Sequence, residues 1–512
     1  MKRFFLSVGV AIALTVSLLG CAVNDTDYVV SNTVGVDYDG EIIEDEAEDS
    51  TGLDLRCLNK TEYVDGRMCD VLNINLYYLL NVWWNNEKPE ALINQTGIAT
   101  DLLDETQLAQ IDRSRESFVN WRNTDELYLV VNPNRGYTEN SIRPLSHVCD
   151  VVTVGILGDY YDEKVVGISK HDARQMVIKL ISASTKSYEN DEWGCTWQSA
   201  LWAENIGFSA WLLWDDLSEK DKQAVEFMII TEANNILNNY DIPYYKDING
   251  NEICYGDTKG EEIAWNLKIF ALASCMFPDN ENVPLWEDKL VKMILAATSS
   301  PQDLNSDEVV DGVVLAEFLQ GTNVHEDGTV INHGLYHVDY MTTIIEELMQ
   351  VYLIYGIAGK EPLDSLKHNI DLIYQGLVEV DLGIYDINKE GSHFYQRDEN
   401  GRATAITDMP GDNDWGGHWY ANYYLTDVYV MALGLDANLS EELKADKWAA
   451  KHFEEILRMV YREEGNFFIA GENNFVSGEM FQMHNLVKAY MLINLMKYDT
   501  ENSVEGEGYC PT

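Results

Sequence analysis

The stretch from Gly321 to Tyr340, GTNVHEDGTVINHGLYHVDY, concentrates side chains that can exchange protons. It contains three of the ten histidines of the chain, and a tyrosine closes it. Histidine titrates near neutral pH, and a tyrosine hydroxyl can donate or accept a hydrogen bond. If the segment is already helical, His333, His337 and Tyr340 fall on one face. We therefore expect a proton-transfer site here, with His337 against the substrate.

Two other roles are open to these histidines. His333 and His337 have the spacing of a zinc-binding pair, but no H-E-x-x-H motif is present and a third ligand is not evident. We therefore expect no metal. The histidines could also merely cap or pack the helix that follows. Upstream, Asp247–Asn251 begins like a calcium loop, but Glu252 stands where that loop requires glycine, so we interpret it as a turn.

Aromatic and hydrogen-bonding residues cluster in two further polar loops, 189–198 and 411–420. Flat aromatic faces stack on sugar rings, and nearby polar groups can bind hydroxyls. Core packing is the alternative role for the aromatic residues. The candidates for binding a glycan are Trp193, Trp197, Gln198, Asp414, Trp415, His418 and Trp419.

A third cluster lies around residue 260. Thr258 and Glu261 have the spacing of a capping box, which predicts a helix start. Glu262 and Asn266 are four residues apart and would share one face of that helix, where both could meet substrate. The alternative is a capped helix with a solvated acidic turn. Arg397 is a candidate for binding a carboxylate, although a single arginine is more often a surface charge.

Helical periodicity runs through most of the chain, and its clearest stretch is Met341–Tyr355. Long loops rich in Asp, Asn, Gly, Trp and Tyr separate the expected helices. This organisation predicts an all-α fold, an (α/α) toroid of helical hairpins, with an irregular helical solenoid as the alternative. We assign residues 54–500 to this domain, with room for an N-terminal subdomain up to about residue 150, and residues 501–512 to a tail.

The N-terminus resembles a bacterial lipoprotein signal. Met1-Lys2-Arg3 precedes the apolar run Phe4–Leu19, and Gly20 stands before Cys21. Residues 1–20 would be the signal peptide and Cys21 the lipid-bearing first residue. Residues 21–53 are acidic and unpatterned, which predicts a disordered linker. We therefore expect a protein held to the outer face of a bacterial cell membrane by its lipid alone.

Charge and cysteine content restrict the partners. The chain has 86 acidic and 35 basic residues, a formal net charge of −51, which argues against nucleic acid. It also counts against a strongly anionic substrate unless the cleft is locally basic. Eight cysteines, without a CxxC pair, imply neither a zinc knuckle nor a disulfide framework. Cys57 and Cys69 are the local candidates for a disulfide.

The order of the motifs resembles that of the toroid polysaccharide lyases, the group of hyaluronate/chondroitin lyases and heparinase-type enzymes. Trp193 and Trp197 lie on an early hairpin, and Asn266 lies near a helix start. A D-G-x-x-x-x-H segment ends at His333, and Tyr340 follows it. The C-terminal β-sandwich of that group is missing here, because helical patterns continue to about residue 496.

The resemblance implies β-elimination on a polysaccharide that contains uronic acid, without a redox cofactor. Asn266, together with Arg397, would neutralise the sugar carboxylate and so acidify the C5 proton. His333 or Tyr340 would remove that proton, and Tyr340 could protonate the leaving oxygen.

Two other functions remain open from the sequence, and we expect a monomer for all three. A glycoside hydrolase on the same fold needs two carboxylates about 5 to 9.5 Å apart. Glu261 or Glu262 with Asp412 or Asp414 could supply them. A lipoprotein that binds a glycan or another solute without catalysis would use the aromatic residues alone.

Overall fold

The computed structural model describes residues 52–84, 137–332, 334–381, 394–405, 419–461 and 478–505. Contacts divide the chain into residues 1–48 and residues 49–512, and every described residue belongs to the second unit. This unit is mostly helical with a few short strands, which confirms the predicted all-α class. Cys21 and the proposed signal lie outside the described residues. In the described ranges, no helix has the length and apolar character needed to cross a membrane.

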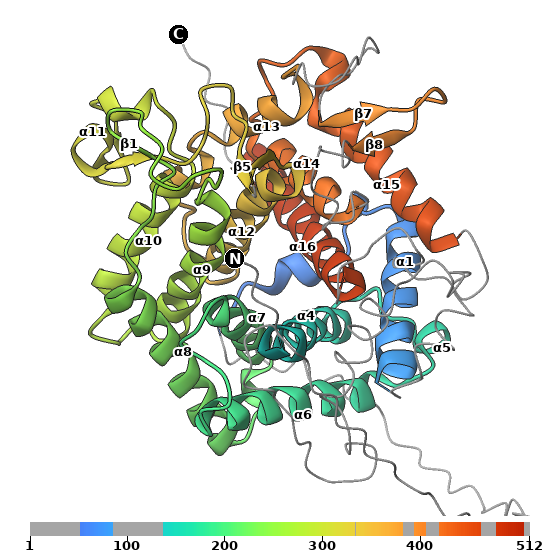
Figure 1. Ribbon diagram of the computed structural model, residues 1–512. Helices are drawn as coiled ribbons and strands as arrows, with labels where there is room; N and C mark the ends of the chain where they lie inside the picture. Colours follow the sequence, from blue (N-terminus) through green and yellow to red (C-terminus); the bar gives the residue numbers. More distant parts are fainter. Residues whose placement is uncertain are drawn as a thin grey trace, which may run out of the picture. The chain divides into compact units, whose positions relative to one another are not determined.

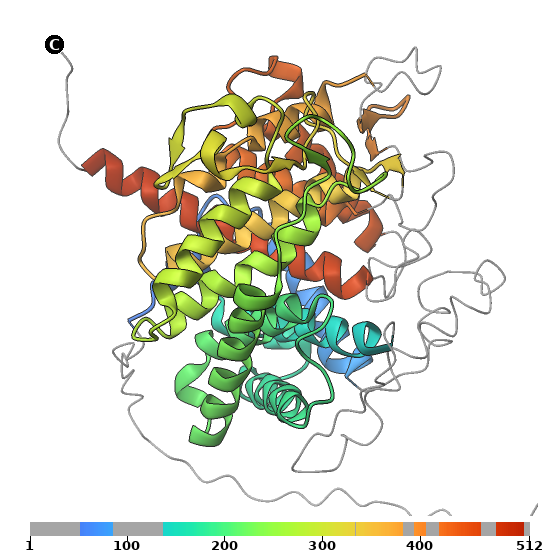
Figure 2. The ribbon, with the colours of Figure 1, turned by 60° about the vertical axis from the view of Figure 1, so that its left-hand side comes forward.

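Six of the described helices pack in a closed order at the centre of this unit (Figures 1 and 2). Each contacts the next along the chain, and the last returns to the first. The central helices are α4 (Tyr137–Leu157), α7 (Ser199–Leu212), α9 (Gly260–Met276), α12 (Val338–Ile357), α14 (Tyr420–Leu433) and α16 (Gly478–Glu505). All of α7 is buried, because its apolar residues occur on every face.

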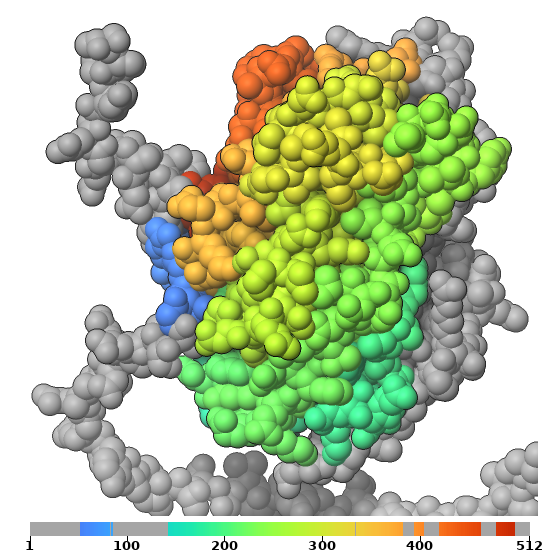
Figure 3. Space-filling view, turned by 90° about the vertical axis from the view of Figure 1, so that its left-hand side faces the viewer, coloured from blue at the N-terminus to red at the C-terminus, as the bar shows by residue number. Residues whose placement is uncertain are grey.

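The outer helices alternate with the central ones along the chain and pack against their outward sides. They are α1 (Gly66–Tyr77), α6 (Lys170–Glu189), α8 (Glu219–Asn239), α10 (Val283–Ala297), α13 (Ile370–Val378) and α15 (Ala445–Tyr461). Figure 3 shows the surface on the side of α8 and α10, which cover α9. Short helical segments lie between them: η1 (Leu55–Leu58), η2 (Tyr78–Trp83), α5 (Glu163–Val166), η4 (Trp214–Asp216), η5 (Asp303–Asn305), α11 (Leu315–Phe318), η6 (Asp364–Lys367) and η7 (Glu441–Leu443).

Short antiparallel pairs of strands form in the loops between helices. The pairs are β1 (Lys246–Asp247) with β4 (Gly321–Thr322), β2 (Val309–Val310) with β3 (Val313–Val314), β5 (Ile331–Asn332) with β6 (Leu335–Tyr336), and β7 (Tyr395–Arg397) with β8 (Ala403–Ala405). The turn near Asp247 is confirmed, because its carboxylate accepts hydrogen bonds from the backbone N–H groups of Asn249 and Asn251 at 2.8 and 2.9 Å.

The segment from Gly321 to Tyr340 is a hairpin rather than the start of a helix. Strands β5 and β6 flank Gly334, whose φ of +81° suits a tight turn, and α12 begins only at Val338. The condition under which His333, His337 and Tyr340 would share a helical face is not met, because α12 begins after His337, and His333 lies outside the described residues. Gly328 also has positive φ, and a Cβ there would lie 1.9 Å from the Leu372 carbonyl oxygen.

The predicted helix start near residue 260 is confirmed, but its capping box is wrong. No side chain caps α9. The Thr258 hydroxyl instead donates to the Ile331 carbonyl oxygen at 2.7 Å, and Glu261 accepts from the Asn332 amide at 2.6 Å. Both residues turn to the β5–β6 hairpin because it lies against the start of α9. The candidate disulfide is also absent, since Cys57 and Cys69 are free thiols.

A buried cation joins three central helices. Lys268 on α9 is 0% exposed, and its Nζ lies 2.9 Å from a carboxylate oxygen of Glu204 on α7. The same Nζ lies 2.8 Å from a carboxylate oxygen of Glu347 on α12. Burial alone would lower the pKa of Lys268, but the two carboxylates outweigh it and raise this pKa above its usual value. A buried charge of this kind is tolerated only when it is paired.

We predict that Lys268→Ala lowers the free energy of unfolding by about 3 to 5 kcal/mol, because it leaves two buried carboxylates without their cation. The matched control is Lys292→Ala. It removes a solvent-exposed pair with Asp288, which should contribute only about 0 to 1 kcal/mol. Urea denaturation of both variants measures the difference. Equal stability of the two would contradict a structural role for Lys268.

Candidate functional site

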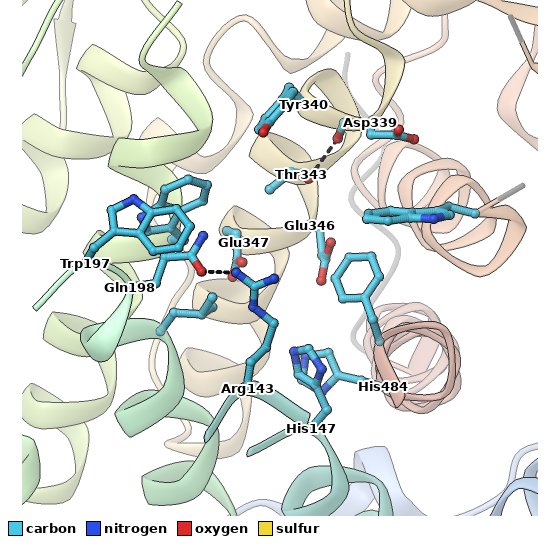
Figure 4. Close-up of a pocket in the computed structure, with 14 residues that line it drawn as sticks. Arg143, His147, Trp197, Gln198, Asp339, Tyr340, Thr343, Glu346, Glu347 and His484 are labelled. Carbon is cyan, nitrogen blue, oxygen red and sulfur yellow. Dashed lines mark hydrogen bonds between the residues drawn. The ribbon is translucent and has the colours of Figure 1, made fainter. Parts of the chain in front are cut away.

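A pocket of about 210 Å³ lies where the N-terminal ends of the central helices meet (Figure 4). Among its lining residues, Gln198 and Trp419 directly precede α7 and α14, and Asp339 is in the first turn of α12. Phe481 lies in the first turn of α16. Trp265 on α9 and Arg143 on α4 follow within the first two turns of their helices. The positive ends of the helix dipoles are thus directed to the pocket.

Aromatic side chains form two walls of the pocket. Trp197 is 39% exposed and packs edge-on against Trp265, with 5.8 Å between ring centroids. Trp419, directly before α14, packs on Phe481 of α16 with 4.7 Å between ring centroids. Two aromatic walls that face one cavity can hold a flat apolar surface between them.

The loop that carries Trp197 is held by a buried carboxylate. Glu232 on α8 is 0% exposed and accepts hydrogen bonds from the Cys195 backbone N–H, the Tyr188 hydroxyl and the Ser199 hydroxyl at 2.6, 2.9 and 2.9 Å. Cys195 and Gln198 have φ values of +46° and +61°, a conformation that costs energy for residues other than glycine. The anchoring by Glu232 keeps this loop in place against that cost.

Arg143 brings a positive charge into the pocket. Its side chain is buried at 7% exposure, and its guanidinium donates a hydrogen bond to the side-chain carbonyl of Gln198 (Figure 4). Gln198 can receive this bond because its backbone conformation directs the side chain toward α4. A guanidinium presents paired N–H donors that match a carboxylate.

Tyr340 supplies a phenol at the start of α12. It lines the pocket, and its ring packs against the ring of His337 with 4.3 Å between centroids. Burial raises the pKa of Tyr340, and the charges of Glu261 and Asp339 raise it further, while Arg143 opposes them. The phenol therefore keeps its proton at neutral pH and can donate it.

Titratable groups from α4, α12 and α16 line the pocket, and Asp150 of α4 contacts one of them without lining the pocket itself. The rings of His147 and His484 lie 4.6 Å apart between centroids, and burial lowers the pKa of both, so they are neutral at neutral pH. Burial and the charge of Glu347 raise the pKa of Glu346 to about 8. Asp150, 3.2 Å from His484, has its pKa raised to about 8 by burial and then by Glu204.

The pocket includes four of the residues that the sequence singled out. Trp197, Gln198, Tyr340 and Trp419 line it. The predicted residues His333, Asp414, Trp415 and His418 lie outside the described residues.

The other predicted residues are placed elsewhere and have partners of their own. Trp193 is buried and donates to the Ser184 carbonyl at 3.1 Å. Asn266 donates to the Glu262 carbonyl at 2.9 Å, and the Glu262 carboxylate pairs with Lys259 at 3.1 Å. His337 is buried behind Tyr340. Arg397 donates to the Glu442 carbonyl at 2.8 Å, and its guanidinium lies over the Trp448 ring.

Sequence reasoning missed ten of the fourteen residues that line the pocket. The missed residues with polar or aromatic side chains are Arg143, His147, Trp265, Asp339, Thr343, Glu346, Glu347, Phe481 and His484. A signal for some of them exists, because Glu346 and Glu347 interrupt the clearest helical stretch of the sequence, Met341–Tyr355. A charge in such a stretch is rarely buried without a function or a partner.

The site contains no evident metal centre within the described parts of the chain, where no cluster of three or more His, Cys, Asp or Glu side chains is arranged to hold an ion. Comparison with known proteins gave no match, whether to protein-family models, to curated proteins or to solved structures. The functional argument therefore rests on the pocket itself.

We predict that Glu346→Gln stabilises the protein more at pH 8 than at pH 5. The folded chain keeps the Glu346 proton up to about pH 8, whereas the unfolded chain loses it near the ordinary pKa of 4.5. Wild-type stability therefore falls as pH rises through this window, by up to about 1.4 kcal/mol per pH unit. Urea denaturation at both pH values measures this difference, and an equal effect at pH 5 and pH 8 would contradict it.

Proposed function

We propose that the protein is a carbohydrate-active enzyme that cleaves a polysaccharide containing uronic acid by β-elimination. We also propose that its helices form an (α/α) toroid, in which the central helices are the inner ring. The alternation of central and outer helices along the chain supports this fold. The proposal includes a lipid anchor at Cys21 on the outer face of a bacterial cell, which rests on the N-terminal sequence.

The observation that carries the proposal is that Arg143 and Tyr340 line the same aromatic-walled pocket. Trp197, Trp265 and Trp419 offer faces on which sugar rings can stack. The helix N-termini and Arg143 make the pocket locally favourable to an anion, although the chain has a formal net charge of −51. This supports an acidic substrate for an acidic protein, since exposed charges are screened beyond about 8 Å.

Arg143 and Tyr340 would each have a role in this chemistry. Arg143 would bind the sugar carboxylate and withdraw charge from it, which acidifies the proton on C5. A base removes that proton, the C4–O bond breaks, and a C4–C5 double bond forms. His333 is our candidate for the base. Tyr340, which holds its proton at neutral pH, would donate it to the leaving oxygen. Arg143 thereby takes the role that the sequence suggested for Asn266 and Arg397.

A second function is favoured by one observation. Asp339 and Glu346 both line the pocket; Asp339 accepts a hydrogen bond from the Tyr423 hydroxyl at 2.8 Å, and burial raises the pKa of Glu346 to about 8. Two carboxyl groups in unlike environments are what a glycoside hydrolase needs for its acid and its base. A hydrolase would release reducing ends without forming a double bond.

We predict that the protein releases unsaturated, ultraviolet-absorbing products from a polysaccharide that contains uronic acid. Tyr340→Phe and Arg143→Ala should each lower kcat/KM by about 100-fold or more, because one removes the proton donor and the other removes the carboxylate partner. Tyr255→Phe is the matched control, since Tyr255 is 93% exposed and is not among the lining residues.

The assay reads ultraviolet absorbance and reducing ends over a panel of acidic and neutral polysaccharides. Reducing ends without absorbance would favour the hydrolase, and binding without either signal would favour a glycan-binding protein. Full activity in Tyr340→Phe or Arg143→Ala would contradict the proposed lyase site.

A further inference from the structure

Glu346 lies where its side chain can bind a ligand in the pocket. It lines the pocket from α12 at 2% exposure, and Figure 4 shows it reaching into the same space as Arg143 from α4. Its buried Oε2 has no hydrogen-bond partner among the described residues. A buried polar atom that faces a cavity without a partner costs free energy that a ligand can recover.

We propose that Glu346 determines specificity by binding the sugar carboxylate as an uncharged carboxylic acid, opposite Arg143. The inference rests on the proposed function. It adds Glu346 as a substrate-binding residue and predicts that binding of the acidic sugar weakens at high pH. A carboxylic acid donates one O–H bond, whereas an ionised Glu346 could only accept and would repel the substrate. An O–H donor bound to a carboxylate gives one of the stronger hydrogen bonds in proteins.

Burial is the main cause that favours the uncharged form of Glu346. The charge of Glu347 adds to it, whereas Lys268, which favours ionisation, is shared by Glu204 and Glu347. Lys488 on α16 favours ionisation of Glu346, but burial and the charge of Lys268 lower the pKa of Lys488 itself.

The remaining titratable groups come from the other helices that surround the pocket. His147 and His484 are neutral at neutral pH, and Asp150 on α4 has its pKa raised to about 8. Arg143 keeps its charge and faces the pocket from α4. An uncharged Glu346 would not repel a carboxylate that Arg143 binds in the pocket.

The test measures binding of glucuronate by calorimetry to the full-length protein between pH 6.5 and pH 9, with glucose as the neutral match. Glucuronate stays ionised over this range, so any change belongs to the protein. If the pKa of Glu346 is about 8, this side chain is protonated in about one tenth of the molecules at pH 9. The Kd for glucuronate should therefore be about tenfold higher at pH 9 than at pH 6.5. Glucose should show no such rise.

Three variants test whether the pH dependence of glucuronate binding comes from Glu346. Glu346→Gln keeps a donor that does not titrate, so it should bind glucuronate at pH 9 nearly as well as at pH 6.5. Glu346→Ala should bind glucuronate more weakly at both pH values. Asp150→Asn is the matched control, because Asp150 titrates in the same range but does not line the pocket, and it should keep the tenfold rise.

The outcomes separate this inference from the proposed function. A tenfold rise that persists in Glu346→Gln, or a large loss of binding in Glu346→Gln at pH 6.5, would overturn the role of Glu346. If no uronate, monomeric or polymeric, binds at any pH while the protein is folded, the proposed function itself fails. Circular dichroism of each variant confirms that folding is intact.

Discussion

The contact on which the described structure depends is the buried Lys268 between Glu204 and Glu347. It joins α7, α9 and α12, and it requires these helices to keep one fixed arrangement, because a shift of any of them would leave a charge unpaired in the core. The three helices bring Gln198, Trp265 and Tyr340 to the pocket. The positions of these pocket residues therefore depend on the pairing of Lys268 with Glu204 and Glu347 in the interior.

The fold class could be predicted from the sequence because helical periodicity is a local property. Met341–Tyr355 lies within α12, and the expected start of α9 near residue 260 is present. Strand pairing between distant segments is not local, which is why the β5–β6 hairpin was missed. In this hairpin, Ile331 and Asn332 form hydrogen bonds with Thr258 and Glu261, so these two residues do not form a capping box.

The site could be predicted only where its residues lie in polar loops. Trp197, Gln198 and Trp419 stand at loop ends and were found, as was Tyr340. Arg143 and the acidic pair on α12 lie inside helices, and their convergence depends on the packing order of helices that no local pattern encodes. For the acidic pair the sequence contains a signal, which is a charge within an apolar helical stretch, as also at Lys268. Such charges mark the inward faces of helices that must pair with one another.

The most direct test of the account is a crystal structure of the inactive Tyr340→Phe variant soaked with a uronic-acid oligosaccharide. We predict a sugar ring between the aromatic walls of the pocket, with its carboxylate bound by Arg143 on one side and Glu346 on the other. A sugar bound elsewhere, or one whose carboxylate points away from Arg143, would contradict the central claim that this pocket recognises an acidic sugar.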